Sequence, residues 1–184
     1  IHAEDTQPEP DVTAPAYIIM DAKTGTVLYG KNVDQKVYPA STTKIMTILL
    51  ALKYGDIQKS FTVSDFDVFS LEDGASNIAL EPGEVIQMED ALYAAGIPSA
   101  NDACNGIAEA VGGTYDQFIE MMNKEANDAG AKNTHFANPH GLHDDNHYTT
   151  PYDLAMIMRQ GINVDGFTKY LSTDEYVIPA TNKH

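Results

Sequence analysis

Two periodicities of apolar and polar residues along the chain predict a mixture of strands and helices. Short apolar runs at 17–20 and 26–29 flank the stretch Asp-Ala-Lys-Thr-Gly, so residues 16–30 are predicted to form a β-hairpin. Short strands are also expected at 61–63 and 177–178 because of their β-branched and aromatic residues.

Longer apolar runs with helical spacing are bounded by residues that start or stop helices. Thr114 and Gln117 form a capping-box pattern, and Pro151 suits the first position of a helix. The helices predicted after the central one span residues 87–95, 102–111, 114–129 and 150–161. Residues 70–83 show no period and residues 131–149 are polar, so both segments are expected to form loops.

The longest apolar run, residues 45–52, follows Pro39 and a cluster of small hydroxyl residues that begins at Ser41. It is apolar on all sides, which is typical of a helix buried in a core, and Gly55 suits its end. We therefore predict a central buried helix with Ser41 at its N-terminus. Lys44, three residues further on, then lies one turn along the same face as Ser41.

A hydroxyl and an amine held one helical turn apart can perform nucleophilic chemistry. A serine hydroxyl is a weak nucleophile until a base removes its proton, and a lysine acts as that base only when its pKa is lowered. The positive end of the helix dipole favours both the neutral amine and an anionic oxygen. In the structural alternative, Ser41 caps the helix and Lys44 is an exposed surface lysine. The motif S-x-x-K alone does not decide between these interpretations.

Length and charge restrict the organisation of the chain and its partners. Its 184 residues suit one domain, and the formal net charge of −16 argues against nucleic acid or anionic lipid as a partner. No stretch is long and apolar enough to span a bilayer. The polar, proline-containing residues 1–14 are predicted to be a disordered leader, such as the remainder after signal-peptide removal, and residues 15–184 the domain.

A single cysteine and a cluster of histidines and aspartates are also candidates for thiol chemistry and metal binding. Cys104 is the only cysteine, so it forms no internal disulfide, and its small apolar neighbours favour a buried packing role. One polar segment gathers potential zinc ligands: His135, His140, His143 and His147 with Asp144 and Asp145. Their spacing matches no standard helical ligand pair, so we interpret them as loop residues and expect no metal site.

The triplet Ser99-Ala100-Asn101 is a second candidate site. It lies between two predicted helices, in a loop from which a hydroxyl and an amide can face a cleft. Alone, Ser99 could simply cap the helix predicted from residue 102. With Ser41 and Lys44, however, the triplet gives S-x-x-K followed by S-x-N. These are two of the three signatures of the serine penicillin-recognising enzymes, and they occur in the same order.

The resemblance extends beyond these motifs. Residues 21–28, 39–50, 97–103 and 138–142 resemble the serine-type D-alanyl-D-alanine carboxypeptidases, and the similarity covers nearly everything after the leader. It implies an α+β fold, the αβα sandwich of the β-lactamase/transpeptidase-like proteins, with the Ser41 helix central and the sheet incomplete at the C-terminus. It also implies an extracytoplasmic place of action, on the bacterial cell wall.

The activity that this resemblance implies is acyl transfer on peptidoglycan stem peptides ending in D-Ala-D-Ala, without a cofactor. Ser41 is then the nucleophile that attacks the penultimate alanine carbonyl, and Lys44 is its base. Ser99 helps to pass the proton to the departing D-alanine, and Asn101 holds an amide of the substrate. Water hydrolyses the acyl-enzyme, and β-lactam antibiotics acylate the same serine. The backbone N–H of Ser41 suits one half of an oxyanion hole.

The third family signature, K-T-G, is missing from its usual place after S-x-N. The only K-T-G is Lys23-Thr24-Gly25, which precedes Ser41 and suits the hairpin turn, so we reject it as the catalytic triplet. We interpret the chain as a fragment whose remaining strands were removed or come from another chain. That chain would be a complementing C-terminal fragment or a swapped copy, because an incomplete sheet exposes an unpaired edge.

Two other functions fit parts of this pattern. A class A-like β-lactamase shares the first two signatures, but such enzymes use a glutamate in an E-x-x-x-N pattern, which this chain lacks. Slow release of bound penicillin favours the carboxypeptidase, and rapid turnover favours the β-lactamase. A non-catalytic module that binds peptidoglycan or β-lactams would form no covalent adduct.

The 184 residues on their own are predicted to be weakly active or inactive as a peptidase. The strand that carries K-T-G normally supplies one oxyanion donor, and loss of one donor lowers a rate roughly a hundred- to a thousand-fold. Release of D-alanine from a D-Ala-D-Ala peptide by the purified chain is the measurement. Robust turnover would contradict the prediction.

Overall fold

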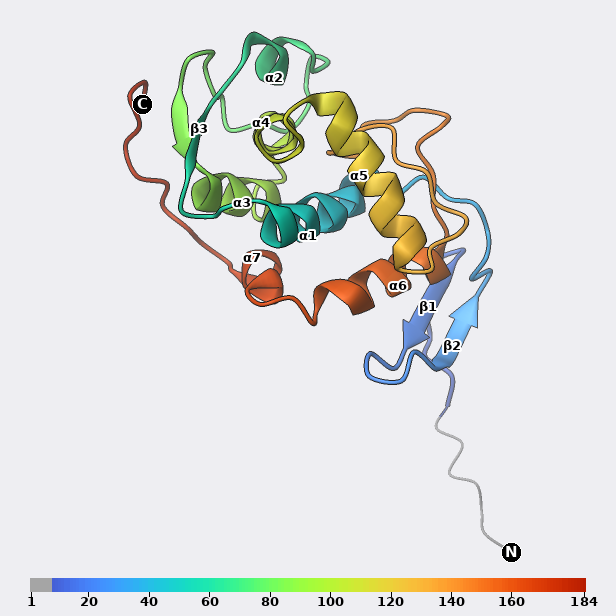
Figure 1. Ribbon diagram of the computed structural model, residues 1–184. Helices are drawn as coiled ribbons and strands as arrows, with labels where there is room; N and C mark the ends of the chain where they lie inside the picture. The colour runs from blue at the N-terminus through green and yellow to red at the C-terminus, as the bar shows by residue number, and fades with distance from the viewer. Residues whose placement is uncertain (1–7) are drawn as a thin grey trace, which may run out of the picture.

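A core of helices with two small antiparallel sheets at its edges makes up the fold (Figure 1). The structure, a computed structural model, describes residues 8–184, so the first half of the predicted leader lies outside the described residues. The elements in chain order are β1 (Tyr17–Met20), β2 (Val27–Lys31), a 3-10 turn (Ala40–Thr43), α1 (Lys44–Tyr54), β3 (Ser60–Thr62), α2 (Asp65–Phe69), β4 (Val85–Gln87), α3 (Met88–Gly96), α4 (Asn101–Gly112), α5 (Tyr115–Asp128), α6 (Pro151–Gly161) and α7 (Phe167–Ser172).

Helix α1 lies in the interior, as its apolar sequence predicts. Its side chains Ile48, Leu49 and Leu50 are fully buried, and the helix contacts α3, α4, α5, α6 and α7. Burial of each such side chain stabilises the fold by about 1.5–3 kcal/mol. Figure 1 shows α1 crossing the middle of the molecule with α4 seen end-on above it. The rest of the helical core is therefore built around α1.

Helix α4 is made of small residues, which allow its neighbours to approach closely. A side chain at Gly106 would lie 2.5 Å from the Phe61 ring of β3, a contact that only glycine permits. Cys104 is fully buried on the same helix, which confirms its predicted packing role. Because α4 contacts α1, α2, α3 and α5, its first residues are fixed in position by the whole core.

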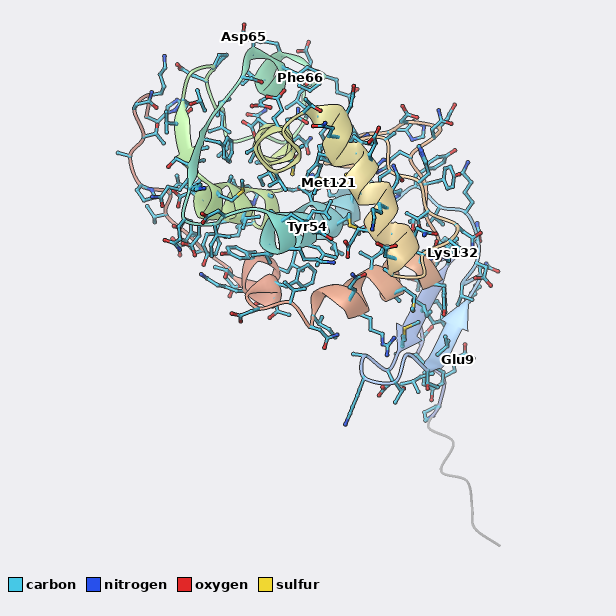
Figure 2. The ribbon with its side chains drawn as sticks, in the orientation of Figure 1. Glu9, Tyr54, Asp65, Phe66, Met121 and Lys132 are labelled. Carbon is cyan, nitrogen blue, oxygen red and sulfur yellow. The ribbon has the colours of Figure 1, made fainter. Side chains whose placement is uncertain are left out.

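A buried carboxylate joins three of the helices at the far end of α1. Glu125 on α5 accepts a hydrogen bond of 3.0 Å from the Tyr54 hydroxyl, and it also bonds Lys53 of α1 and Gln160 of α6. Tyr54, labelled in Figure 2, ends α1. A buried charge costs several kcal/mol unless it is paired, and these three donors compensate that cost.

The N-terminal hairpin forms as predicted. Strands β1 and β2 pair antiparallel with an irregularity between Ile19 and Met20. In the turn, Asp21 accepts hydrogen bonds from the backbone and hydroxyl of Thr24 at 2.6 and 2.8 Å, and Gly25 has a φ of +77°. The segment Lys23-Thr24-Gly25 therefore lies in the hairpin turn, as the sequence indicated.

Three short elements were not predicted, namely α2, β4 and α7. Each has only three to six residues, too few to show a period in the sequence. The strand expected at 177–178 is wrong, because Val177 and Ile178 belong to no strand or ladder. The capping pattern of α5 is half realised: Thr114 accepts from the Gln117 backbone at 3.2 Å.

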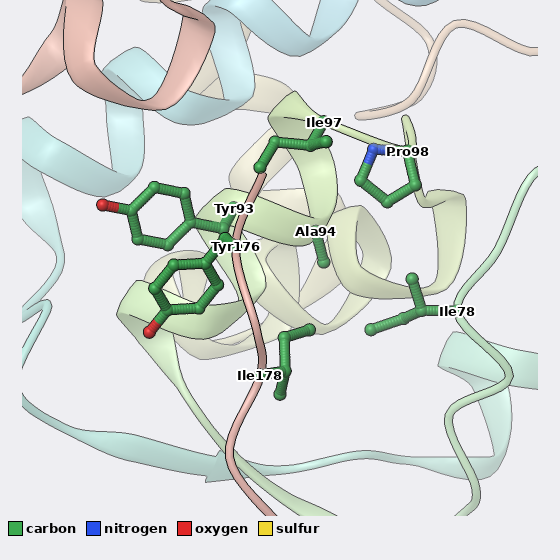
Figure 3. Close-up of a pocket in the computed structure, with 7 residues that line it drawn as sticks. All are labelled: Ile78, Tyr93, Ala94, Ile97, Pro98, Tyr176 and Ile178. Atoms are coloured by element: carbon green, nitrogen blue, oxygen red, sulfur yellow. The ribbon is translucent and has the colours of Figure 1, made fainter. Parts of the chain in front are cut away.

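The last segment, residues 173–184, runs along the outside of α3 towards the β3–β4 pair (Figure 1). Tyr176 stacks on Tyr93 with ring centroids 3.8 Å apart and donates to Asp90 at 2.6 Å. Side chains rather than a strand ladder hold this segment in place. An apolar cavity of about 250 Å³ remains beneath it (Figure 3). Its lining residues are Ile78, Tyr93, Ala94, Ile97, Pro98, Tyr176 and Ile178.

The predicted loop 131–149 folds back over the start of the central helix. Val37 and Thr149 exchange backbone hydrogen bonds of 2.9 Å, which attach the loop to the segment before Ser41. Further along, Gly141 has a φ of +98°, and a side chain there would lie 1.8 Å from the Ala40 carbonyl oxygen. Glycine at 141 therefore permits direct contact between the loop and the turn that carries Ser41.

Substitution of Gly141 by alanine is expected to destabilise the protein far more than the same change at Gly74. Both glycines have positive φ, but the position of a Cβ at Gly74 meets no atom within 4 Å. Gly74→Ala should cost about 1 kcal/mol of backbone strain, and Gly141→Ala at least about 2 kcal/mol more because of the clash. Urea unfolding of the two variants measures the difference, and equal costs would contradict the prediction.

Candidate active site

Ser41 lies in a 3-10 turn that leads directly into α1. The α-helix begins at Lys44 rather than at Ser41, and no side chain caps either element, so the prediction that Ser41 begins the α-helix is corrected. Ala40, the residue before the serine, has a φ of +49°, which is strained for a residue with a side chain. Strain of this kind is concentrated at functional sites, and here it orients the backbone at Ser41.

Lys44 is buried beside this serine, with only 4% of its surface exposed. Its amine lies 2.7 Å from Asn101 Oδ1, 2.8 Å from the His140 carbonyl oxygen and 3.4 Å from Ser41 Oγ. Within residues 8–184 no carboxylate pairs with it. Burial lowers the pKa of Lys44, and the neighbouring Cys104 opposes that shift. The alternative of an exposed surface lysine is therefore wrong.

Ser99 approaches the same serine from the loop between α3 and α4. Its hydroxyl lies 3.0 Å from Ser41 Oγ, and its backbone has a φ of +61°. The N-cap position of α4 is Ala100, and no side chain forms a capping hydrogen bond there, so Ser99 is not a helix cap. A second strained residue with a side chain thus places a second hydroxyl against Ser41.

Asn101 begins α4 and is buried, with its amide oxygen on the amine of Lys44. Its backbone N–H donates to the Ser76 carbonyl at 2.8 Å. The next residue, Asp102, accepts from the backbone of Ile78 and Leu80 at 3.0–3.2 Å. These bonds fix the 70–80 loop against the start of α4, so the triplet 99–101 has a rigid frame.

The structure therefore brings together all four residues that the sequence singled out. We call Ser41, Lys44, Ser99 and Asn101 the serine–lysine cluster. An amine within reach of one hydroxyl, which in turn contacts a second, can accept a proton, and a second hydroxyl can relay it. The lining of the apolar cavity in Figure 3 includes Pro98, the residue before Ser99, and none of the four cluster members.

Residues of the 131–149 loop complete the surroundings of the cluster, and the sequence analysis assigned none of them a role beside Ser41. The His140 carbonyl accepts from Lys44, and Thr47 of α1 donates to the Pro139 carbonyl at 2.5 Å. Buried His147 lies with Nε2 2.6 Å from the Thr43 hydroxyl. The resemblance over 138–142 was the only signal that this loop mattered.

Burial keeps two histidines of this loop neutral. It lowers the pKa of His140 to about 3 and that of His147 to about 4, and a positive charge on Lys44 would lower the pKa of His140 further. In the part of the chain that the structure describes, no group of three or more histidine, cysteine or acidic side chains is arranged to hold a metal ion. Likewise, none of the described helices is both long and apolar enough to cross a membrane.

Comparison with protein families gives the class of this protein. Residues 3–183 match the family model of the peptidase S11 group, described as D-alanyl-D-alanine carboxypeptidase. The chain belongs to this family of serine peptidases, as its motifs predicted.

Individual relatives agree with this assignment. The chain is 38% identical over 174 residues to the D-alanyl-D-alanine carboxypeptidase DacF of Bacillus subtilis (strain 168), covering 92% of this chain and 44% of that protein. It is 34% identical over 156 residues to DacA of Escherichia coli (strain K12), covering 80% of this chain and 39% of that protein. The chain therefore spans less than half the length of these two relatives.

Solved structures confirm the fold. Penicillin-binding protein 6B from Escherichia coli superposes with a TM-score of 0.87 at 28% identity, over 98% of this chain and 60% of that one. The D-alanyl-D-alanine carboxypeptidase DacD from Francisella tularensis gives a TM-score of 0.82 at 33% identity, over 89% of this chain and 40% of that one. The described residues thus form part of the penicillin-binding DD-peptidase fold, with helix and sheet mixed as expected.

The free energy of unfolding is expected to fall as the pH drops from about 6.5 to about 4. His147 is neutral in the fold above about pH 4, whereas an unfolded histidine gains a proton near pH 6.5. In that window the unfolded state binds more protons, so acid destabilises the fold, by up to about 3 kcal/mol for this residue. Urea unfolding at several pH values measures the loss.

A His147→Gln variant isolates this histidine from the other groups that titrate. Asp67, whose pKa is raised to about 6 by burial, acts in the opposite direction and partly masks the effect in the wild type. Because Asp67 titrates equally in both proteins, the difference between wild type and His147→Gln removes it. A difference in unfolding free energy that does not change between pH 7 and pH 4 would contradict the prediction.

Proposed function

We propose that the protein is a serine DD-carboxypeptidase, which removes the terminal D-alanine from peptidoglycan stem peptides through an acyl-enzyme on Ser41. The observation that carries this proposal is the buried amine of Lys44, 3.4 Å from Ser41 Oγ, with no carboxylate beside it within residues 8–184. A buried amine without a counter-ion favours its neutral form, which is the form that acts as a base.

The partners of Lys44 support this role for the amine. A neutral amine has two N–H bonds and one lone pair. Two carbonyl oxygens, on Asn101 and His140, lie at hydrogen-bond distance and accept those two N–H groups. The lone pair is then left for the third neighbour, Ser41 Oγ, and accepts its proton.

The reaction then follows in two steps. Ser41 Oγ attacks the carbonyl carbon of the penultimate D-alanine while its proton passes to Lys44 Nζ. As the peptide C–N bond breaks, the Ser99 hydroxyl donates its proton to the departing amine and receives one from Lys44. Water hydrolyses the resulting ester and restores Ser41. Asn101 contributes an amide N–H to the bound peptide.

The substrate class and the location follow from the family. We propose peptidoglycan stem peptides ending in D-Ala-D-Ala as substrates and β-lactams as covalent inhibitors, because relatives of this fold are named as penicillin-binding proteins. Action on the cell wall requires an extracytoplasmic location, with consequences for cell shape.

The third signature of the family, K-T-G, does not follow Ser99-Ala100-Asn101 within these 184 residues. The only K-T-G lies in the β1–β2 turn, where Arg159 donates to the Ala22 and Lys23 carbonyls at 2.9 and 3.0 Å. We propose that a further segment of the protein, or a complementing or swapped chain, provides K-T-G beside the serine–lysine cluster. This keeps the 184 residues alone weakly active.

Incubation with a penicillin tests the proposed function. In the full-length protein we expect a stable mass increase equal to the penicillin, located on Ser41, with slow release. Lys44→Ala should lower the acylation rate at least about 100-fold, because the base is lost. Mass spectrometry over time measures both.

Matched controls separate the rival functions. Ser41→Ala should abolish the adduct, and Ser172→Ala, which changes a serine on α7, should leave it intact. Rapid turnover of penicillin would identify a β-lactamase instead. Absence of any adduct in the folded wild-type protein would leave a binding module and overturn the proposal.

A further inference from the structure

The loop over the catalytic helix is attached to it at three side chains of one stretch. The Thr43 hydroxyl contacts His147 Nε2, the Lys44 amine donates to the His140 carbonyl, and the Thr47 hydroxyl donates to the Pro139 carbonyl. Only the middle contact belongs to the proposed chemistry. The other two hold the loop on either side of it.

The hydrogen bonds of His147 define its protonation. The backbone N–H of Ala137 donates to Nδ1 at 2.9 Å, so Nδ1 carries no hydrogen. The hydrogen of the neutral ring therefore lies on Nε2, which donates to the Thr43 hydroxyl at 2.6 Å. One imidazole thus accepts from the loop and donates to the turn that carries Ser41.

A charged His147 is incompatible with this arrangement. An imidazolium has N–H at both nitrogens, so Nδ1–H would oppose the N–H of Ala137. The titratable groups near the ring are few: Asp144 favours its charge, whereas His135 and His143 oppose it. From the helix it meets the uncharged Thr43, and Phe136 packs on the ring with centroids 5.6 Å apart.

The 131–149 loop limits the access of water to the Lys44 amine. It supplies the His140 carbonyl at 2.8 Å, and Gly141 contacts the backbone at Ala40 and Ser41. Loosening this loop would withdraw one acceptor from the amine and admit water beside it. Hydration stabilises the ammonium and raises the pKa of Lys44, so a smaller fraction of the amine would be neutral and able to accept a proton near pH 7.

We propose that His147 is a positioning residue for catalysis: its neutral ring bonds Thr43 and Ala137, and so holds the His140 carbonyl on Lys44 and keeps water from the amine. The inference rests on the proposed function of the serine–lysine cluster. It assigns to His147 no contact with the substrate.

The test follows the pH dependence of Ser41 acylation by a penicillin in the full-length protein. His147→Ala should lower the rate at pH 7 at least about tenfold and raise the apparent pKa of the rising limb by about one unit, because Lys44 becomes hydrated. His147→Gln should rescue both values, with a rate within about threefold of the wild type. Glutamine offers an amide N–H and a carbonyl oxygen, which replace the donor and the acceptor of the ring.

A destabilised control distinguishes positioning from stability alone. Ile86, on β4, is buried where β4 packs on β3 and α3, at the other end of the fold from the 131–149 loop, so Ile86→Ala lowers stability and leaves that loop unchanged. This variant should keep the wild-type apparent pKa. If His147→Ala also keeps it, or if glutamine rescues nothing, the proposal is overturned.

Nitrogen NMR of the wild-type imidazole provides a test that does not depend on the reaction. We expect His147 to be neutral at pH 7 with its hydrogen on Nε2, and the Lys44 amine to titrate at higher pH in His147→Ala. A charged ring, or hydrogen on Nδ1, would overturn the inference. If the wild type forms no penicillin adduct but both NMR results hold, the proposed function fails while the positioning role stands.

Discussion

The site depends on removing one amine from water. Lys44 lies at the start of a helix whose other side chains form the core, and its neighbours are carbonyl and hydroxyl oxygens rather than carboxylates. A carboxylate at the same distance would hold the ammonium form, whereas neutral oxygens solvate the amine without fixing its charge. The position of the lysine in the fold thus favours the neutral amine, which is the form that can accept a proton.

Three separate segments must meet for this to happen, and each carries a local cost. Ala40 and Ser99 have left-handed backbone conformations that residues with side chains rarely adopt. The third segment, the 131–149 loop, contacts the 3-10 turn at Ala40 only because Gly141 has no side chain. The buried helices α1 and α4 and the bonds of Asp102 to the 70–80 loop stabilise these strained positions.

The acidic surface and the site have different physical roles. A formal net charge of −16 suits a solvated surface, and the cluster itself contains a single ionisable side chain, Lys44. The chain spans less than half the length of its two compared relatives, and its helices carry the serine–lysine cluster. The relation of this part to a K-T-G strand belongs to the proposals above.

The sequence by itself determined the long helices, the hairpin, the turn at Lys23-Thr24-Gly25 and all four members of the serine–lysine cluster. Periodicity and motif spacing depend on residues close together in the chain, so they can be read from the sequence without the fold. Only the tertiary structure decided that Lys44 is buried, that Ser99 faces Ser41, and that His140 and His147 lie against the helix about a hundred residues earlier. Burial and long-range hydrogen bonds arise from packing between distant segments, and no local pattern encodes them.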